Sequence, residues 1–338
     1  MSNSWPEILG LLTSRVSLDR GQAAWAMERI MQGEASPSQL GAFLAALRTK
    51  GETVDEMVGL VETMRSFSRK VEVDYPVVDT CGTGGDRTGS VNVSTTSAFV
   101  LAGAGAKVAK HGNRAASSSC GSADLLEALG VKIDLGPDGV RRCLDEAGIG
   151  FCFAPIFHPS MRHAGRVRKE LGVATVFNFL GPMTNPAGAQ FQALGVSDGA
   201  MAPRMVSVLA TLGTVRALVF HALDGMDEIS LSGPTHLWDL NEGRVGESQI
   251  DPLEFGIPRA EGAELKGGDA ERNAQVAIAV LEGLSGPMRD VIVINSAAGA
   301  IACGLAEDFP TAIGIVSESI DRGDARRALS ALVEVSNK

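Results

Sequence analysis

From about residue 74 onward, short apolar segments alternate with helical stretches, and this alternation constrains the fold more than any other feature of the chain. Five segments fit strands: YPVVDT, AKVAKH, IGFCFAP, ALGVSD and VRALVFHA. The stretches between them, such as STTSAFVLAGAG and GPDGVRRCLDEAG, fit helices. Strands that are joined by crossover helices pair in parallel, and the helices cover the sheet. The sequence therefore predicts a mostly parallel central sheet flanked by helices.

The segment after the last of these strands departs from the alternation. EISLSGPTHLWDLNEGRV fits a pair of antiparallel strands with an Asn-Glu-Gly turn near Gly243. From about Gly268 the pattern returns to helices. We therefore expect an antiparallel excursion at one side of the sheet, followed by a helical end of the chain.

The first 70 or so residues carry the pattern of helices alone. One helix is predicted to begin with Ser36 as N-cap, Pro37 at the first helical position and Gln39 closing a capping box. Thr53 and Glu56 repeat this arrangement for the next helix. Apolar residues recur along one face of each predicted helix. This part of the chain is predicted to be a small all-α unit.

Composition and charge limit the classes of function. With 338 residues, 45% of them hydrophobic, the chain can bury a full core. The formal net charge of -10 argues against a general binder of nucleic acid or of an anionic membrane, because phosphate surfaces require clustered Lys and Arg. The cysteines are Cys81, Cys120, Cys143, Cys152 and Cys303. Their odd number and scattered spacing indicate neither a disulfide framework nor a zinc site.

The N-terminal segment MSNSWPEILG has no basic region followed by a long apolar run. No segment approaches the roughly 18 consecutive apolar residues of a membrane-spanning helix. We therefore expect a cytoplasmic protein without a membrane partner.

The segment DTCGTGGD, Asp79 to Asp86, follows the first predicted strand and places three glycines between two aspartates. Glycines let backbone N–H groups approach a ligand closely, which is how proteins often hold phosphate. Neither the Gly-Lys-Ser/Thr ending of a P-loop nor the third glycine of a dinucleotide-binding loop is present. An aspartate beside the loop would repel a bare phosphate, so the ligand must tolerate an acid. The alternative is a tight turn between strand and helix that binds nothing.

More polar residues collect where the carboxyl ends of the predicted strands should meet, which is where parallel sheets bind ligands. They are Asn92, Ser94 and Thr95 at the start of the next helix, and Lys110, His111, Asn113 and Arg114 in KHGNR. Helix capping explains one residue of the first group, and a solvated loop could explain the second. So many donors within a few residues favour an anion-binding site.

Two adjacent acids, Asp227 and Glu228, follow the strand VRALVFHA. Such a pair usually lies on a solvated surface. Opposite a phosphate-binding loop it becomes a plausible Mg²⁺ site, because Mg²⁺ binds a few carboxylates while keeping water and phosphate oxygens as further ligands. A metal would also explain the acid beside the glycine loop. The ligand that these residues indicate is a Mg²⁺-chelated pyrophosphate.

Eight segments together, in this order, resemble the anthranilate phosphoribosyltransferases. The segments are GTGGD (82 to 86), NVST (92 to 95), KHGNR (110 to 114), GSADLLEALG (121 to 130), FAPIFHPSMR (153 to 162), VRKELG (167 to 172), NFLGPMTNPA (178 to 187) and DGMDEIS (224 to 230). The resemblance implies transfer of phosphoribosyl from 5-phosphoribosyl 1-pyrophosphate (PRPP) to the amine of anthranilate, with release of pyrophosphate, in tryptophan biosynthesis. It also implies Mg²⁺ as cofactor and a homodimer.

The resemblance further implies a division of the chain into two hinged domains. Residues 1–72 would form the small α domain, together with a helical return segment around residues 160–187. Residues 73–159 and 188–338 would form the large α/β domain that binds PRPP. The fold class is that of the nucleoside phosphorylases and related phosphoribosyltransferases.

Site residues follow from the same resemblance. The residues implied to bind PRPP are Gly82, Thr83, Gly84, Gly85, Asp86, Thr88, Asn92, Ser94, Thr95, Lys110 and Ser122. The residues implied to bind anthranilate are Gly82, His111, Asn113, His158, Arg168 and Gly181. The implied metal ligands are Ser94, Asp227 and Glu228, and the implied catalytic residues are Lys110, Asp227 and Glu228.

Arg168 also has a rationale of its own, since a guanidinium group can pair with an aromatic carboxylate through two hydrogen bonds. From the residues alone, a solvated position on a helix is the preferred interpretation of Arg168. Two other classes of protein are considered. A nucleoside phosphorylase would carry a KxSGR-type segment in place of KHGNR, and a nucleic-acid-binding relative should be basic and lack some of the acids.

Overall fold

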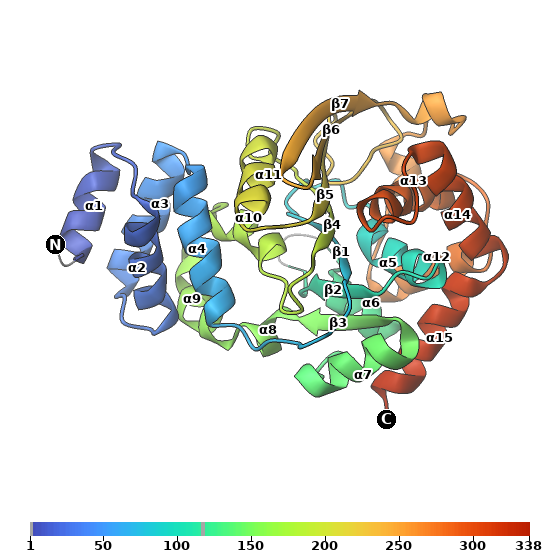
Figure 1. The fold of residues 1–338 in the computed structure, drawn as a ribbon, viewed down its shortest axis with the longest axis horizontal. Helices are drawn as coiled ribbons and strands as arrows, with labels where there is room; N and C mark the ends of the chain where they lie inside the picture. Colours follow the sequence, from blue (N-terminus) through green and yellow to red (C-terminus); the bar gives the residue numbers. More distant parts are fainter. Residues whose placement is uncertain (1–2, 116–118) are drawn as a thin grey trace.

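The computed structural model describes residues 3–115 and 119–338 of the chain. A bundle of helices forms the N-terminal end of the molecule, and a seven-stranded sheet with helices on its faces forms the remainder (Figure 1). Residues 116–118, which follow Arg114 in the sequence segment RAASSSCGS, lie outside the described residues. The arrangement confirms the predicted fold class, a small helical part joined to a larger α/β part with a mostly parallel sheet.

Four helices make up the N-terminal bundle: α1 (Trp5–Thr13), α2 (Arg20–Met31), α3 (Pro37–Lys50) and α4 (Val54–Ser66). Both predicted capping boxes are confirmed. Gln39 N donates to Ser36 Oγ at 3.2 Å, and Ser36 N donates to Gln39 Oε1 at 2.9 Å. Thr53 and Glu56 make the same reciprocal pair of bonds. Such bonds satisfy backbone N–H groups that the first helical turn leaves without partners, typically worth about 1 kcal/mol for each cap.

The sheet has the strand order β3-β2-β1-β4-β5-β6-β7. Its strands are β1 (Val78–Gly82), β2 (Val108–Gly112), β3 (Ile149–Phe153), β4 (Phe191–Gly195), β5 (Arg216–Ala222), β6 (Thr235–Asn241) and β7 (Arg244–Ile250). The pairs from β3 to β5 are parallel, and β6 and β7 are antiparallel. The predicted turn is confirmed, with Glu242 and Gly243 at positive φ. The chain runs from β1 to β2 and β3 on one side of β1, and then to β4 and β5 on its other side. The direction in which strands are added to the sheet therefore reverses between β1 and β4. Parallel sheets commonly bind ligands at such a position.

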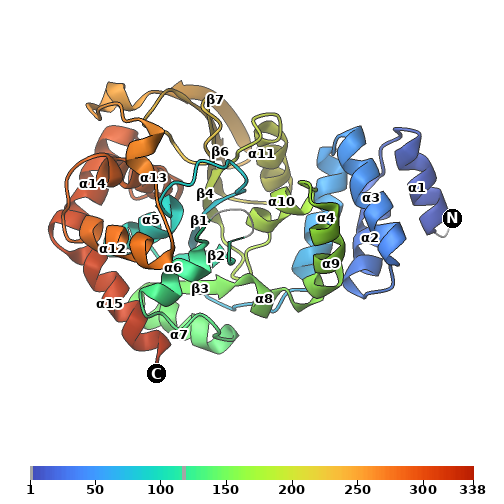
Figure 2. The ribbon, with the colours of Figure 1, turned by 180° about the vertical axis from the view of Figure 1, so that it is seen from behind.

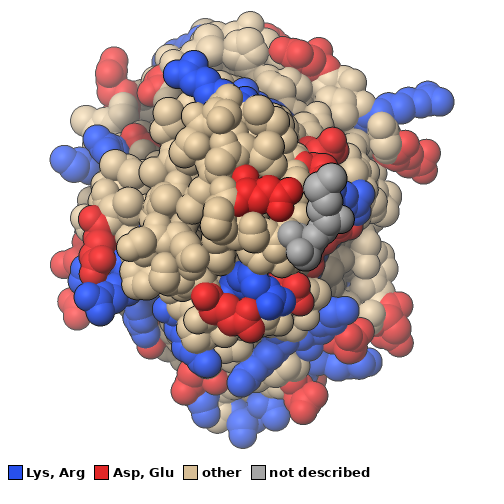
Figure 3. Space-filling model, turned by 90° about the vertical axis from the view of Figure 1, so that its left-hand side faces the viewer, with Lys and Arg blue, Asp and Glu red and all other residues tan. Residues whose placement is uncertain are grey.

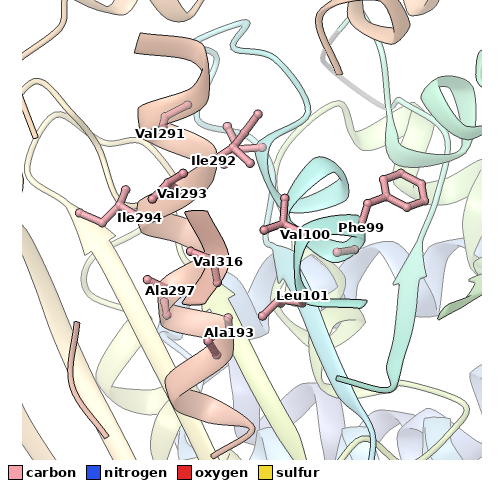
Figure 4. Packing of buried hydrophobic residues seen from close by; sticks show 14 of the residues in the cluster. Phe99, Val100, Leu101, Ala193, Val291, Ile292, Val293, Ile294, Ala297 and Val316 are labelled. Carbon is pink, nitrogen blue, oxygen red and sulfur yellow. The ribbon is translucent and has the colours of Figure 1, made fainter. Parts of the chain in front are cut away.

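Helices cover the two faces of the sheet and its edge. They are α5 (Val93–Gly103), α6 (Ser122–Ala128), α7 (Pro137–Ala147), α11 (Ala202–Thr211), α12 (Ala270–Leu281), α13 (Pro287–Ala302), α14 (Phe309–Asp321) and α15 (Asp324–Ser336). Figure 4 shows side chains of α13, among them Ile292 and Ala297, in one core with Leu101 of α5 and Ala193 of β4. Burying a Val, Leu or Ile side chain contributes about 1.5 to 3 kcal/mol, so this core fixes the position of α5 behind β1.

A second core joins the N-terminal bundle to the other face of the sheet. Two helices from the middle of the chain, α9 (Arg162–Leu171) and α10 (Phe177–Leu180), pack into this core with α2, α3 and α4 (Figure 2). The remaining short helices are α8 (Ala154–Phe157) and the 3-10 turns Pro159–Met161, Gly181–Met183, Pro252–Phe255 and Gly262–Leu265. Within the described part of the chain, no helix combines the length and the apolar character needed to cross a membrane.

Candidate active site

The glycine segment forms a loop between β1 and the start of α5, and two backbone bonds fix its first residues. Thr83 N donates to the carbonyl oxygen of Gly195 at 3.0 Å, and Gly84 N donates to Asp227 Oδ2 at 2.6 Å. Gly84 and Gly85 adopt φ values of +68° and +85°, which residues with a Cβ rarely adopt. The Asp86 carboxylate accepts a bond from Thr88 Oγ1 at 2.7 Å within this loop. It also lies against Asp227, and its negative charge raises the pKa of that carboxyl group.

Gly82 lies at the end of β1 and leaves room for the side chain of Asp227. A Cβ built on Gly82 would lie 2.2 Å from Asp227 Oδ2, and one built on Gly195 would lie 1.7 Å from the carbonyl oxygen of Asp227. Both distances are far below van der Waals contact. The two glycines therefore allow the turn that carries Asp227 and Glu228, the acidic turn, to approach β1 and β4 closely.

Asp227 and Glu228 are buried side by side, with exposed fractions of 9% and 8%. Glu228 Oε1 accepts a bond from Ser94 N at 3.1 Å, as Asp227 accepts one from Gly84 N. Burial raises the pKa of both carboxyl groups, and the charge of Asp227 raises that of Glu228 further. Two carboxylates that are held so closely together favour a cation beside them. The pair thus fits a divalent metal.

Within the residues that the structure describes, no three side chains of His, Cys, Asp or Glu cluster in a way that could hold a metal. A metal at the acidic pair would therefore take its other ligands from Ser94, from water and from a bound substrate. This is the coordination that Mg²⁺ prefers, since it gives up its waters reluctantly and binds few protein carboxylates.

Two further residues hold the acidic turn in shape. The Asp224 carboxylate accepts bonds from Ser230 Oγ at 2.6 Å and from Met226 N at 3.1 Å. Asn295 of α13 accepts a bond from Ile229 N at 2.8 Å and donates to the carbonyl oxygen of Ile229 at 3.0 Å. Neither role was predicted from the sequence. In the sequence, Asn295 is the one amide within the apolar segment VIVINSAAGAIA. Its position among apolar residues is the one feature of the sequence that could have indicated a structural role.

The three polar residues at the start of α5 have different surroundings. The Asn92 side chain makes two hydrogen bonds within the protein. Its Nδ2 donates to the carbonyl oxygen of Cys120 at 3.0 Å, and its Oδ1 accepts a bond from Asn273 Nδ2 at 2.8 Å. Thr95 is 1% exposed. Ser94 contacts Glu228 through its backbone N–H, and its Oγ accepts a bond from Lys110 Nζ at 3.4 Å. Of the three, the structure brings Ser94 together with Lys110 and Glu228.

Lys110 is buried in the middle of β2 and is oriented by the carbonyl oxygen of Thr80, to which Nζ donates at 2.6 Å. Burial lowers its pKa, and the nearby carboxylate of Asp79 opposes this shift most strongly. Lys110 therefore places its amino group beside Thr80, Ser94 and Glu228.

His111, the next residue of β2, lies on the opposite side of the strand and faces His158, with the ring centroids 5.1 Å apart. Both rings are buried, and neither Nε2 has a hydrogen-bond partner within the described residues. Burial lowers the pKa of His111 to about 3 and that of His158 to about 4. Backbone bonds link His111 to Gly181 and His158 to Thr184. The segment around Gly181 thus faces two neutral imidazoles.

Asn113 and Ser122 lie together at the rim of the site. Asn113 N donates to Ser122 Oγ at 3.1 Å, and Ser122 Oγ is the same distance from the carbonyl oxygen of Asn113, to which it donates. The Asn113 side chain is exposed. Arg114 is occupied elsewhere, because it pairs with Asp124 and Glu127 of α6. Of the basic residues in KHGNR, Lys110 alone reaches the acidic pair within the described residues.

Arg168 projects from α9 and lies over the ring of Phe177, with its guanidinium carbon 5.2 Å from the ring centroid. It is partly buried, and burial lowers its pKa. No carboxylate in the described parts of the chain lies within ion-pair distance of it. A half-buried guanidinium without a counter-charge differs from the solvated residue that sequence alone favours, and it is suited to an anionic ligand.

The buried histidines predict a specific response of stability to acid. An unfolded histidine binds a proton below about pH 6.5, whereas His111 and His158 stay neutral in the folded chain down to about pH 3 to 4. Stability should therefore fall as the pH drops from about 6.5 toward 4, because the unfolded state gains protons first. The double variant His111→Asn/His158→Asn should lose less of its melting temperature between pH 7 and 5 than the wild type. If calorimetry shows that both proteins lose the same amount of melting temperature, the two histidines are not buried in the neutral state.

Comparison with known proteins defines the class to which this fold and site belong. Residues 74–326 match the model for the α/β domain of a glycosyl transferase family, and residues 6–68 match the model for the helical bundle domain of the same family. A protein named anthranilate phosphoribosyltransferase from Herpetosiphon aurantiacus is 49% identical, over 96% of this chain and 97% of its own. One from Chloroflexus aurantiacus is 50% identical over 98% of both chains.

Solved structures agree with this result. The anthranilate phosphoribosyltransferase of Thermus thermophilus has a TM-score of 0.93 at 40% identity, over 98% of this chain and 99% of that one. The enzyme of Saccharomyces cerevisiae in complex with PRPP and Mg has a TM-score of 0.91 at 27% identity, over 98% of both chains. The chain belongs to the anthranilate phosphoribosyltransferase family. The resemblance seen in the sequence and the predicted enzyme class, a pentosyltransferase, are confirmed.

Proposed function

We propose that this chain transfers the phosphoribosyl group of PRPP to the amine of anthranilate, which gives N-(5-phosphoribosyl)anthranilate and pyrophosphate in tryptophan biosynthesis. The observation that supports this most is the acidic pair buried against a glycine loop at the end of β1. The fluorescence of anthranilate allows its consumption to be followed with and without PRPP and Mg²⁺. We expect turnover that requires all three. Consumption without PRPP, or none with all three present, would contradict the proposal.

Mg²⁺ is the proposed cofactor, held by Asp227 and Glu228 with Ser94 as a third ligand. The buried carboxylates, whose pKa is raised in the absence of a cation, support this assignment. When bound, Mg²⁺ supplies positive charge against the pyrophosphate oxygens. Asp224 and Asn295 contribute indirectly, because they keep the turn that carries the two acids in one shape.

The donor side of the site is proposed to bind PRPP. The proposed contacts are Gly82, Thr83, Gly84, Gly85, Asp86, Thr88, Asn92, Ser94, Thr95, Lys110 and Ser122. The hard part of the reaction is departure of pyrophosphate from C1 of the ribose, since negative charge then grows on the leaving group. Lys110 is already fixed by the carbonyl oxygen of Thr80, so its charge stabilises the leaving group without having to reorganise.

The acceptor side is proposed to bind anthranilate through Gly82, His111, Asn113, His158, Arg168 and Gly181. The amine of anthranilate is uncharged at neutral pH and has a free lone pair, so it needs no strong base before it attacks. The neutral state of His111 and His158 agrees with this requirement, because neither ring adds a charge beside an aromatic amine. Arg168, which lies over Phe177, is placed to pair with the carboxylate.

The two domains predicted from the sequence, 1–72 with 160–187 and 73–159 with 188–338, are proposed to close over the substrates. Three connecting segments lie side by side between them, since Arg69 N donates to the carbonyl oxygen of Phe157 and Val71 N to that of Pro186. A small number of connections favours hinge motion between the two parts. Closure would align the amine with C1 and exclude water, which otherwise hydrolyses the activated sugar.

A homodimer is proposed as the assembly. Figure 3 shows wide areas without charged residues at the end formed by the N-terminal helices. Leu9, Leu11 and Trp25 of α1 and α2 are only partly buried by the chain itself. Exposed apolar patches commonly mark protein interfaces. Light scattering on the purified protein should give the mass of two chains, and the mass of one chain would contradict the proposal.

Gly84 offers a test of the donor side. The change Gly84→Val introduces a side chain at φ +68° and beside the proposed pyrophosphate position, so the affinity for PRPP with Mg²⁺ should fall by about fivefold or more. The matched control is Gly89→Val in the same loop. Gly89 has φ +66° and, like Gly84, open space where its Cβ would lie. Calorimetry should show weak binding for the first variant and nearly normal binding for the second. Equal effects would mean that the loop is only a turn.

A further inference from the structure

Asp79 is a buried acid to which the mechanism above gives no task beyond its effect on the pKa of Lys110. It lies on β1, three residues before Gly82, and is 0% exposed. Burial raises its pKa to about 6, which means that folding around its charged form is costly. A carboxylate that is kept in the core at such a cost calls for an explanation from its contacts.

The two carboxylate oxygens of Asp79 bond to two different parts of the chain. Oδ1 accepts a bond from His111 N of β2 at 3.1 Å. Oδ2 accepts a bond from Asn185 Nδ2 at 2.8 Å. The same Asn185 nitrogen also donates to the carbonyl oxygen of Ala109 at 2.7 Å, and Asn185 Oδ1 accepts from Ala187 N at 2.9 Å. The bonds therefore close a small network between the end of β2 and residues 185–187.

Both parts belong to the proposed acceptor side. His111 carries one of the two neutral imidazoles, and its neighbour Lys110 belongs to the donor side. Asn185 lies four residues after Gly181, in the connection through which α9 and α10 return to the sheet. A small displacement of this connection would move the acceptor segment relative to the strand that carries Lys110.

We propose that Asp79 is a positioning residue, whose carboxylate holds the connection at Asn185 against the end of β2 and so sets the acceptor relative to the donor. The proposal rests on the proposed function, because the acceptor side is assigned there. Asp79 contacts neither substrate in this role. A neutral amide could replace only one of its two bonds, since His111 N and Asn185 Nδ2 are both donors.

The experiment compares Asp79→Asn with the double variant Asp79→Asn/Asn185→Asp. In the single variant two amide donors face each other, and kcat/KM for anthranilate should fall by about tenfold or more, because small misplacements of a reactant are costly. The double variant reverses the hydrogen bond, so that the amide at position 79 donates to the carboxylate at position 185, and it restores the negative charge. Its kcat/KM should be at least about threefold higher than that of the single variant, although the carboxylate at position 185 can no longer donate a hydrogen bond to the carbonyl oxygen of Ala109.

Ser319→Ala is the matched control, because it also removes a buried hydrogen bond, from Ser319 Oγ to the carbonyl oxygen of Val100 at 2.8 Å. Its kcat/KM should stay within about twofold of the wild type, since it lies away from the site. If the double variant is no better than the single variant, or if the single variant matches the wild type, the positioning role is wrong.

Asn185→Ser covers the case in which Asp79→Asn does not fold. Serine is too short to reach Asp79 but can still accept the bond from Ala187 N. Anthranilate fluorescence should report binding weakened by about fivefold or more, while calorimetric binding of PRPP with Mg²⁺ stays within about twofold. Equal weakening of both, or of neither, would overturn the proposal. These measurements report binding and do not require turnover. A wild type without activity would contradict the proposed reaction, and it would be distinguished from a failure of the positioning role.

Discussion

The double replacement Asp227→Asn/Glu228→Gln is expected to lower kcat/KM by at least about a hundredfold. Removing preorganised charge stabilisation of a leaving group typically costs roughly 3 kcal/mol or more. The amide oxygens of the new side chains can still accept the bonds from Gly84 N and Ser94 N, so the shape of the site should survive. Calorimetry should show that Mg²⁺ no longer strengthens the binding of pyrophosphate.

Stability gives this variant a second readout. The raised pKa of both acids means that the fold disfavours their charged forms, so neutral amides should leave the melting temperature at neutral pH unchanged or higher. The control variant Glu247→Gln/Glu254→Gln removes two exposed charges from the same chain. Its activity should stay close to that of the wild type. A folded Asp227→Asn/Glu228→Gln variant with near-normal activity would contradict the metal assignment.

The elements that the sequence predicted best are those whose signals are local. The capping box of Ser36 and Gln39 is one example, because both residues act within a single turn. The strand β4 was predicted to begin at Ala193 but begins at Phe191. The polar residue Gln192 interrupts the apolar pattern at the start of this strand. In the structure Gln192 Nε2 is buried and donates to the carbonyl oxygen of Pro182 and to Cys81 Sγ. Contacts with residues outside the strand are not visible in its local pattern.

The site shows the same limit. Motif spacing located Gly82, Lys110 and the acidic pair, because Gly82 ends β1, Lys110 lies within β2 and the acidic pair follows β5 after a short turn. It did not explain why Gly82 is glycine, which follows from the space that Asp227 occupies 145 positions later in the chain. Asn295 was missed for a similar reason, since its bonds to Ile229 join a C-terminal helix to a turn in the middle of the chain.

Arg168→Ala is expected to raise the KM for anthranilate by about tenfold or more. Losing a charge-assisted pair with a ligand costs on the order of 1.5 to 3 kcal/mol, and Arg168 has no ion-pair partner of its own in the described structure to mask that loss. The KM for PRPP should barely change. Steady-state kinetics with each substrate varied in turn separates the two effects.

Arg166→Ala on the same helix is the matched control for Arg168. Arg166 is 86% exposed and pairs with Glu170 at 2.8 Å, so its loss should change neither KM by more than about twofold. Arg168→Met keeps most of the side-chain stem over Phe177 and removes only the charge, and it should behave like Arg168→Ala if pairing with the carboxylate is the cause.

Aniline, which lacks the carboxylate, completes the test of Arg168. If the guanidinium pairs directly with the carboxylate of anthranilate, the wild type and Arg168→Ala should use aniline about equally poorly, because neither complex contains the pair. A variant that loses activity toward aniline as well would indicate a packing defect above Phe177. If KM rises for PRPP and stays normal for anthranilate, Arg168 belongs to the donor side or to the connection between the domains. The acceptor pocket would then have to lie away from α9.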